Sequence, residues 1–275
     1  MPQRIQSPSS INTYNQCPRK YYYQYIAKLP SVESIHLIRG KIVHTVLEDF
    51  FKLDIKSISG GHKEFELNVI LQSMFKELWS NSREKLINLK LGQEKLEFYY
   101  KESQEMINSW FESLIKRIQL KQNQHLTFDE AFNLLKPQTE VYLRSEQHQV
   151  QGFIDAVHDV NGEISLMDYK TSKKGEISQE YRLQLAIYAL LYFEKYGKHP
   201  NLVGVDFLKH GQKFLRVDNE LLELARQECN LIQENTKSGD IQDYPLKTGP
   251  LCKWSTGQCN FYDICFGQKK IDEFK

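Results

Sequence analysis

Two aspartates and a lysine stand at the ends of two neighbouring segments that alternate like β-strands. Asp155 closes the run Gly-Phe-Ile-Asp, and Asp168 and Lys170 flank Tyr169 in the next segment. Side chains alternate across a strand, so Asp168 and Lys170 share a face. Carboxylates hold a hard divalent cation, which polarises a phosphate and lowers the pKa of a bound water. Because the lysine can orient that water or offset charge on the phosphorane, the set suits phosphodiester hydrolysis.

Cysteines form the second group of residues whose side chains could carry out chemistry. The chain has five, and this odd number argues against a disulfide framework. Cys252, Cys259 and Cys265 are separated by gaps of six and five residues, short enough to wrap one soft-metal centre. A fourth ligand is needed, and Cys17 and Cys229 are the candidates. Cys229 falls in a predicted amphipathic helix, where packing in the core also explains it.

The acidic residues need strands to position them, and the middle of the chain has the required pattern. Asn161-Gly162 is a strong hairpin signal between the two acid-bearing segments, so both acids are expected to converge at one place. Helices are predicted at about 179–196 and 219–235. The predicted strands are 127–134, 138–144, 149–158, 163–170, 202–209 and 212–217.

The first part of the chain is predicted to be helical. Ser7 and Pro8 have the types of an N-cap and a first helical residue, and this helix is expected to end near Cys17-Pro18. A short tyrosine-rich segment follows. Apolar residues at helical spacing then predict a helix from about 40 to 53 and long helices between 64 and 121.

Composition and charge limit the classes of protein. The 275 residues contain 36 Lys and Arg and 35 Asp and Glu, so any groove for a nucleic acid depends on local clustering of cations. Neither a long apolar run nor an apolar leader is present, which predicts a cytoplasmic protein without a membrane span. A single domain over 1–275 is expected, with a helical part (7–125), an α/β core (126–237) and a cysteine-bearing tail (238–275).

These motifs together resemble the PD-(D/E)XK nucleases, in their RecB-like, exonuclease V-like branch. Gly-x-Ile-Asp followed by Asp168-Tyr169-Lys170 resembles the core motif of that superfamily. The run from Arg39 to His44 resembles its helical histidine motif, and Gln184-Leu-Ala-Ile-Tyr188 resembles its Gln-x-x-x-Tyr motif. Glu140 resembles an acid often found near the site. Ser7-Pro-Ser through Cys17-Pro-Arg-Lys resembles the N-terminal motif of the branch that carries an iron–sulfur cluster.

The resemblance implies an α/β, restriction-endonuclease-like fold: a mixed central sheet flanked by helices, with a helical N-terminal insertion and a C-terminal cysteine-cluster segment. It implies Mg²⁺ or Mn²⁺ held by His44, Asp155, Asp168 and the carbonyl of Tyr169. The other expected site residues are Lys170, Glu140, Gln184 and Tyr188. It also implies a [4Fe–4S] cluster on Cys17, Cys252, Cys259 and Cys265. Ser255 stands where many relatives have a cysteine, so zinc on four thiolates stays an alternative.

The implied activity is hydrolysis of DNA, as an exonuclease at ends or on single strands in repair, recombination or defence. Arg19, Lys20, Lys173 and Lys174 are further candidates for DNA contact. The chain has no Walker A motif, so a helicase or another repair or adaptation protein is an expected partner. Two alternatives stay open: a CRISPR-adaptation-type RecB-like nuclease, and a DNA-binding or scaffold protein with the same fold and a silent site.

Overall fold

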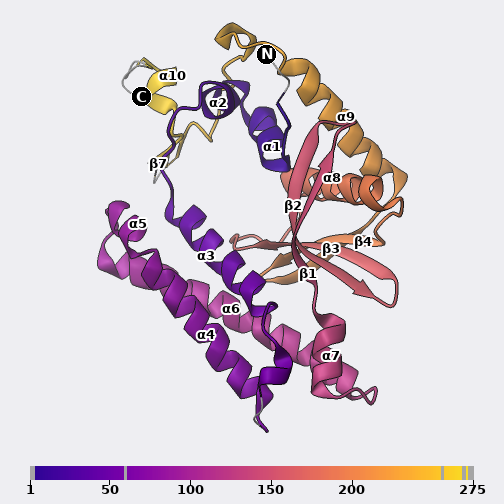
Figure 1. Cartoon of the computed structure of the whole chain (residues 1–275). Coiled ribbons are helices and arrows are strands. Elements are labelled where there is room, and N and C mark those ends of the chain that lie inside the picture. Colours follow the sequence, from indigo (N-terminus) through magenta and orange to yellow (C-terminus); the bar gives the residue numbers. More distant parts are fainter. Residues whose placement is uncertain (1–3, 59–60, 255–256, 268–270, 272–275) are drawn as a thin grey trace.

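The computed structural model describes residues 4–58, 61–254, 257–267 and 271. Figure 1 shows helices from the N-terminal part of the chain, a central sheet, and a C-terminal segment that returns to the first helices. The strands are β1 (Gln138–Ser145), β2 (Val150–Val160), β3 (Glu163–Lys170), β4 (Leu202–Phe207), β5 (Gly211–Arg216), β6 (Lys253–Trp254) and β7 (Gly257–Gln258). The α-helices are α1 (Pro8–Gln16), α2 (Pro18–Tyr21), α3 (Ile35–Phe50), α4 (Lys63–Asn81), α5 (Arg83–Asn88), α6 (Gln93–Gln122), α7 (Phe128–Leu135), α8 (Gln179–Tyr196), α9 (Asn219–Asn235) and α10 (Tyr262–Cys265). Shorter helical turns are η1 (Tyr22–Ile26), η2 (Ile55–Ser57) and η3 (Ile241–Asp243).

The five main strands form one mixed sheet in the order β1-β2-β3-β4-β5. β3 and β4 are parallel and are joined through α8, whereas the other neighbours are antiparallel. The turn between β2 and β3 is Asn161-Gly162, and both residues have positive φ, as a tight hairpin turn requires. The hairpin therefore brings the two acid-bearing strands side by side, as predicted.

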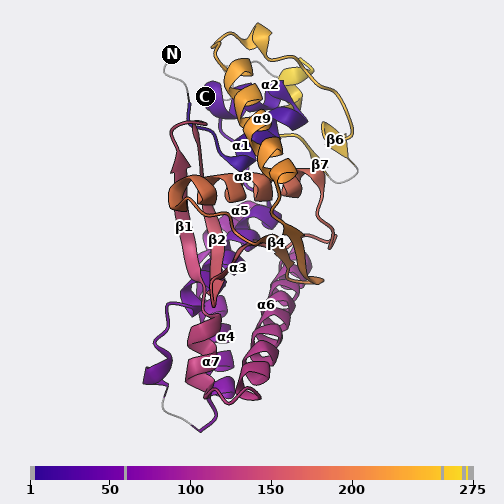
Figure 2. The same ribbon diagram turned by 90° about the vertical axis from the view of Figure 1, so that its right-hand side faces the viewer.

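Helices cover both faces of the sheet, and each face has its own apolar core (Figure 2). Helices α3, α4, α6 and α7 pack together against one face, where Ala156, Met167 and Tyr169 contribute from the strands. Helices α1, α8 and α9 cover the other face, which receives Ile154, Leu166 and Val205. The sheet thus forms the middle layer of three, with the ends of β2 and β3 held from both sides.

Most of the predicted elements are confirmed. α1 begins after Ser7, whose side chain accepts a hydrogen bond from the N–H of Ser10, and it ends at Cys17, whose backbone is extended. β3 and α8 have the predicted bounds, as does α9. The helix predicted from about 40 to 53 is α3, which begins earlier, after the N-cap Ser34.

The predicted strand at 127–134 is wrong: this segment is α7. Thr127 and Glu130 form a capping box, in which each side chain accepts a hydrogen bond from the backbone N–H of the other residue. Ala131, Phe132 and Leu135 are buried at helical spacing. The segment is also rich in Asp, Asn, Glu and Ala, which are depleted in strands, so its composition agrees with the helix.

The architecture confirms the expected fold class, an α/β protein with a mixed five-stranded sheet between layers of helices. Among the residues described, no helix is both long enough and apolar enough to cross a membrane.

Candidate active site

The site lies where β2 and β3 separate. Their ladder is regular from the hairpin to the pair Ala156 and Met167. Beyond that pair, the N–H of Tyr169 donates to Oδ2 of Asp155 over 2.7 Å. A carboxylate thus takes the place of a strand carbonyl. The Asp155 side chain is thereby held between the two strands.

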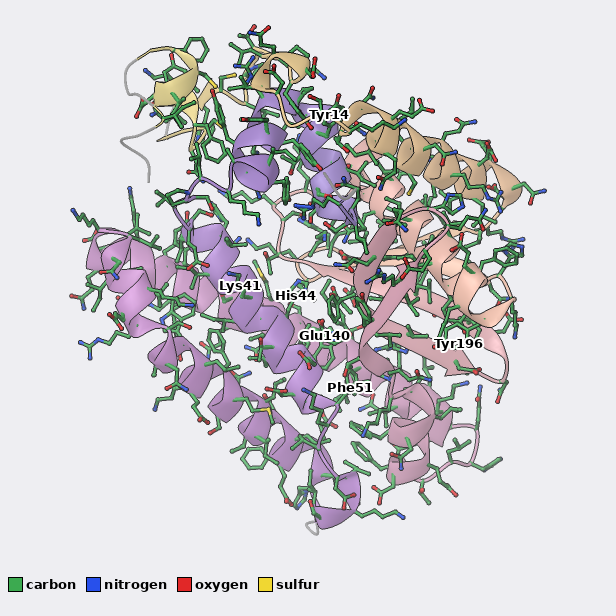
Figure 3. The ribbon with its side chains drawn as sticks, turned by 45° about the horizontal axis from the view of Figure 1, so that its top comes forward. Tyr14, Lys41, His44, Phe51, Glu140 and Tyr196 are labelled. Atoms are coloured by element: carbon green, nitrogen blue, oxygen red, sulfur yellow. The ribbon has the colours of Figure 1, made fainter. Side chains whose placement is uncertain are left out.

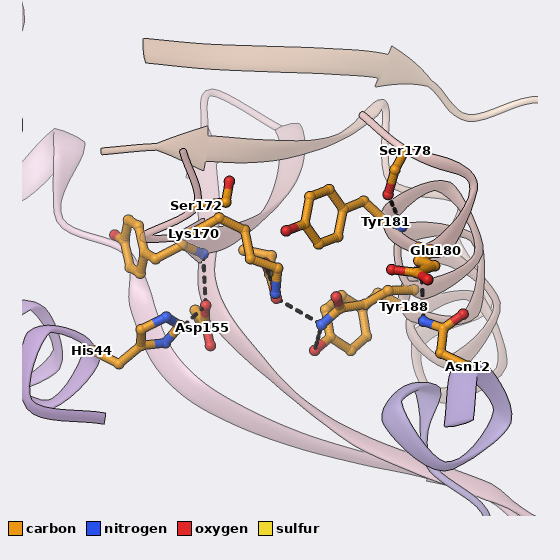
Figure 4. A network of polar contacts seen from close by, with 12 residues as sticks. Asn12, His44, Asp155, Lys170, Ser172, Ser178, Glu180, Tyr181 and Tyr188 are labelled. Atoms are coloured by element: carbon orange, nitrogen blue, oxygen red, sulfur yellow. Dashed lines mark hydrogen bonds and ion pairs between the residues drawn. The ribbon is translucent and has the colours of Figure 1, made fainter. Parts of the chain in front are cut away.

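Asp168 and Lys170 lie on the α8 side of β3. Oδ2 of Asp168 is 2.5 Å from Nζ of Lys170, and Oδ1 accepts a hydrogen bond from Nε2 of Gln184 over 2.7 Å. The same amide of Gln184 donates to the hydroxyl of Tyr188 over 2.8 Å. Nζ of Lys170 also lies 5.3 Å from the ring centre of Tyr181. Helix α8 therefore holds one carboxylate through a chain of side-chain contacts (Figure 4).

His44 approaches from the opposite side, on α3. Its Nδ1 lies 3.3 Å from Oδ2 of Asp155, the oxygen that also accepts from Tyr169. Its ring packs edge-on against the ring of Tyr169. Figure 4 shows His44 and Tyr188 on opposite sides of the Asp155 and Lys170 pair. Residues from α3, β2, β3 and α8 thus meet at one place.

Charge and burial perturb these groups strongly. Burial raises the pKa of Asp168, and the nearby charge of Asp155 raises it further, against the opposing effect of Lys170. Burial also disfavours the charged forms of Asp155 and His44, but their mutual attraction dominates, so the pKa of Asp155 is lowered and that of His44 is raised. The pKa of Lys170 is raised because attraction to Asp168 outweighs burial. Two adjacent buried carboxylates need cations to stay ionised.

Glu140 joins the same charge cluster from β1. Burial raises its pKa, and the charges of Asp155 and Glu48 raise it further. Its φ of 50° is left-handed, a strained conformation for a residue other than glycine. Figure 3 shows Glu140 and His44 facing the same space between α3 and the strands. The strained backbone therefore points an additional carboxylate towards the site.

Gly152 lets α8 approach the sheet closely. A Cβ atom at this position would lie 3.1 Å from Cε1 of Tyr188 and 3.6 Å from Cδ1 of Leu191. A larger residue would push α8 and its Gln184 and Tyr188 away from β3. This packing is a physical reason for glycine in the Gly-x-Ile-Asp sequence.

A buried ion pair beside the site was not predicted from the sequence. Arg39 of α3 pairs with Glu102 of α6, and the two side chains are only 2% and 7% exposed. Lys209 also pairs with Glu102. Nη2 of Arg39 donates to the carbonyl of Thr171 over 3.1 Å, directly after Lys170. The position of Arg39 next to Gly40 in the helical motif was a usable signal, but nothing marked Glu102 within its long helix.

Four of the five cysteines lie together in the structure, and the fifth lies apart from them. Cys17, Cys252, Cys259 and Cys265 line one cavity of about 420 Å³. Burial raises the pKa of Cys265 to about 11, and the negative charges of the other three contribute. Cys229 lies on the buried face of α9, where burial raises its pKa to about 12. Ser255, the position that departs from many relatives, lies outside the described residues.

The cationic candidates for DNA contact divide into two pairs. Nε of Arg19 donates to the carbonyl of Tyr244, and Lys20 lines the cysteine cavity, so both belong to the end of the molecule with the cysteines. Lys173 and Lys174 are exposed in the segment after β3, near the carboxylates. Only this second pair is close along the chain to the site.

The residues present match the donors that a hard divalent cation prefers. Two carboxylates, an imidazole and the backbone carbonyl of Tyr169 near the end of β3 fit this chemistry, and Asp155 and Asp168 lie close enough to interact electrostatically. In the described ranges, however, no three His, Cys, Asp or Glu side chains are already arranged to hold a metal ion. Lys170 and His44 instead compensate the carboxylate charges. Metal binding would therefore require these two contacts to loosen.

Comparison with known families identifies one match over almost the whole chain. The sequence model of the PD-(D/E)XK nuclease superfamily matches residues 6–266. The matched range includes every residue of the site described above.

Individual relatives are more distant. An ATP-dependent helicase/deoxyribonuclease subunit from Carboxydothermus hydrogenoformans is 25% identical over 90% of this chain, which spans only 24% of that protein. The Gene 69 protein of Mycobacterium phage L5 is 24% identical over 94% of both chains. The crystal structure of a "putative exonuclease" from Eubacterium rectale superposes with a TM-score of 0.51 at 13% identity, over 91% of this chain and 86% of that one. That similarity supports the fold alone.

Proposed function

Because this chain belongs to the PD-(D/E)XK nuclease superfamily, we propose that it is a metal-dependent DNA nuclease that hydrolyses phosphodiester bonds. The observation that carries the proposal is the buried group formed by Asp155, Asp168 and Lys170, which lies against His44. A protein that only binds DNA has no need for two adjacent buried carboxylates with a lysine. We also propose that residues 1–275 act as a single nuclease domain.

Each side chain has a role that follows from its contacts. Asp155, Asp168, His44 and the carbonyl of Tyr169 would hold Mg²⁺ or Mn²⁺, which supplies polarisation of the phosphate and a water of lowered pKa. Lys170 would leave its ion pair with Asp168 and face the attacking water or the phosphate oxygens. Gln184 and Tyr188 keep Asp168 oriented and border the path of the substrate strand. Glu140 would accept a hydrogen bond from a water at the edge of the site.

We propose that the substrate is a DNA end or a single strand. The helicase/deoxyribonuclease relative supports DNA as the substrate and supports a helicase as a partner. The chain spans only a quarter of that protein, so any motor activity must come from a separate polypeptide or region. Exonuclease action agrees with the name of the structural neighbour. A role in repair or in adaptation-type trimming is compatible with this chemistry.

We propose further that Cys17, Cys252, Cys259 and Cys265 hold a [4Fe–4S] cluster. Four thiols that line one cavity have the donor chemistry of such a centre. A single zinc ion draws four thiolates to within about 2.3 Å of one point, a closer arrangement than a cluster requires. Zinc on the same four cysteines is the alternative occupant, and metal analysis distinguishes the two.

The direct test is digestion of end-labelled single-stranded and duplex DNA with Mg²⁺ or Mn²⁺, beside samples with EDTA. We expect metal-dependent cleavage that disappears in EDTA and in the variant Asp168→Asn. Products of one nucleotide from the start of the reaction would identify an exonuclease. DNA binding without cleavage under any metal condition would contradict the proposal and favour a silent DNA-binding protein.

A further inference from the structure

Two large aromatic side chains face solvent on the hairpin that carries Asp155. Tyr142 of β1 and Phe153 of β2 are 47% and 54% exposed. They are paired across the strands, and their ring centres lie 5.0 Å apart. Their strand neighbours Leu143 and Ile154 are buried on the other face. Two exposed rings that lie together on an otherwise polar strand face call for a binding partner.

Both rings are held in place without a ligand. The hydroxyl of Tyr142 donates to Oε1 of Gln151 over 2.9 Å, which fixes one ring along β2. The tilted contact between the rings, with planes 44° apart, restrains the other. The rotamers of both side chains are therefore ordered before a flat partner binds, so binding loses little conformational entropy.

The aromatic pair is adjacent to the carboxylates of the site. Strand side chains alternate, so Phe153 and Asp155 lie on one face of β2, about 7 Å apart along the strand. Tyr142 lies two residues after Glu140 on β1. That separation is comparable with one nucleotide step of an extended single strand. A nucleotide next to a phosphate held at Asp155 would thus place its base over the rings.

The size and chemistry of the surface favour a nucleobase as the occupant. Two rings are far smaller than a stable protein interface, which buries on the order of 800 Å² on each partner. Every base has a π-face that stacks on aromatic side chains, and this stacking is available only when the base is unpaired. Within a duplex, both faces of each internal base are covered by its neighbours. The surface therefore discriminates between single-stranded and duplex DNA.

We propose that Tyr142 and Phe153 form a stacking platform for one unpaired base next to the scissile phosphate, which makes the site selective for single-stranded DNA. The proposal rests on the nuclease function proposed above and names the substrate class of that same site.

The test compares Phe153→Leu, which keeps an apolar side chain but removes the ring, with Phe153→Trp, which keeps a ring. Phe214→Leu is the matched control, because Phe214 is an exposed aromatic on β5 of the same sheet. We expect Phe153→Leu to lower kcat/KM on single-stranded DNA by about tenfold, the order expected for one stacked base. Phe153→Trp and Phe214→Leu should stay near wild type.

Oligonucleotides with an abasic residue moved one step at a time locate the base. We expect one position to reproduce the tenfold loss in wild type and to add no further loss in Phe153→Leu. The platform is wrong if Phe153→Leu has no effect, or if its loss is the same at every abasic position. Fluorescence anisotropy of the same oligonucleotides in EDTA makes the same comparison without cleavage. A protein that cleaves nothing but shows the abasic dependence keeps the platform and refutes the nuclease function.

Discussion

Asp155 accepts a hydrogen bond from the backbone N–H of Tyr169 at the point where the β2–β3 ladder ends. This carboxylate therefore has two functions, since it joins the strands and also supplies charge to the site. The two functions can be separated by substitution. An asparagine retains an oxygen that can accept from Tyr169, whereas an alanine leaves that N–H without its acceptor.

We expect Asp155→Asn to lower cleavage by about 10²-fold or more, because a neutral amide is a poor ligand for a divalent cation. Its thermal stability should be close to wild type. Asp155→Ala should lose the same activity and, in addition, about 1–3 kcal/mol of stability through the unpaired N–H. Nuclease assays and urea unfolding measure the two effects. Full activity in Asp155→Asn would remove this residue from the metal site.

Lys170 is expected to act on the reacting groups and not on metal affinity. Lys170→Ala should reduce turnover by roughly 10²-fold or more, as for other preorganised electrostatic groups. Divalent binding, followed by calorimetry, should persist and even tighten, because Lys170 competes for Asp168. Lys198→Ala is the control, an exposed lysine beside the turn between β2 and β3, at the other end of these strands from the site. Weakened metal binding with unchanged turnover at saturating metal would contradict this role.

The buried pair of Arg39 and Glu102 ties α3 to α6 and supports the carbonyl of Thr171 after β3. We expect Glu102→Gln to destabilise the protein by about 3–5 kcal/mol, because it leaves the buried guanidinium without its counter-charge. The double variant Arg39→Met with Glu102→Leu should recover much of that loss, since no fully buried charge is left unpaired and Lys209, the second partner of Glu102, is partly exposed.

Equilibrium unfolding of wild type, Arg39→Met, Glu102→Leu and the double variant forms a double-mutant cycle. Lys41→Met is a matched control on the same helix, because its partner Glu33 lies at the surface. That change should hardly move the unfolding midpoint. Equal losses of stability in Glu102→Gln and Lys41→Met would show that the buried pair stabilises the fold no more than a surface pair does.

Local signals explain which elements could be predicted from sequence. β3 and α8 were predicted with the observed bounds because an Asn-Gly turn precedes one and a left-handed Gly197 ends the other. Strand alternation placed Asp168 and Lys170 on one face, and one helical turn placed Gln184 and Tyr188 on another. The expectation that these two pairs meet came from the resemblance to the nuclease family, because periodicity does not relate a strand to a later helix.

Long-range relationships could not be predicted in the same way. Arg39 and Glu102 are 63 positions apart on two helices, and each alone looks like an ordinary surface charge. The left-handed backbone of Glu140 depends on the way in which β1 meets β2 at the site. The wrong prediction of a strand at 127–134 is different, because its helix signal is local: Thr127 and Glu130 have the spacing of a capping box.

His158 gives the fold a defined sensitivity to acid. It lies on β2, where burial and the charge of Arg117 lower its pKa to about 4. The unfolded chain binds this proton near pH 6.5, so stability should fall as the pH drops from about 6.5 towards 4. The expected loss at pH 5 is about 2 kcal/mol from this group. Urea unfolding at pH 7 and pH 5 should show a smaller difference in His158→Gln, which cannot take up the proton. An unchanged difference would assign the acid sensitivity to other groups.

The last prediction concerns the four cysteines of the cavity as ligands of an iron–sulfur cluster. Protein made with adequate iron under low oxygen should be brown, with iron and sulfide in equal amounts. Cys17→Ala should lose the colour and unfold more readily. The cluster would join Cys17 to the tail and so close a loop over most of the chain, a constraint that stabilises the folded state by several kcal/mol in simple models. Cys229→Ala is the control, because that thiol lies on the buried face of α9 and does not line the cavity.

Cys17→Ala and Cys229→Ala should have different effects, which distinguish the loss of a cluster ligand from the loss of core packing. Cys229→Ala removes a small buried group and should lower stability slightly while the iron content stays at the wild-type level. Cys17→Ser tests the ligand more gently, since it preserves volume and removes only the soft sulfur donor. The outcome is measured by chemical analysis of iron and sulfide and by the visible absorption of thiolate-bound iron. A colourless wild-type protein with one zinc would retain the four ligands and refute the cluster. Full colour in both Cys17 variants would refute the ligand set, because three tail cysteines would then hold the centre with some other group.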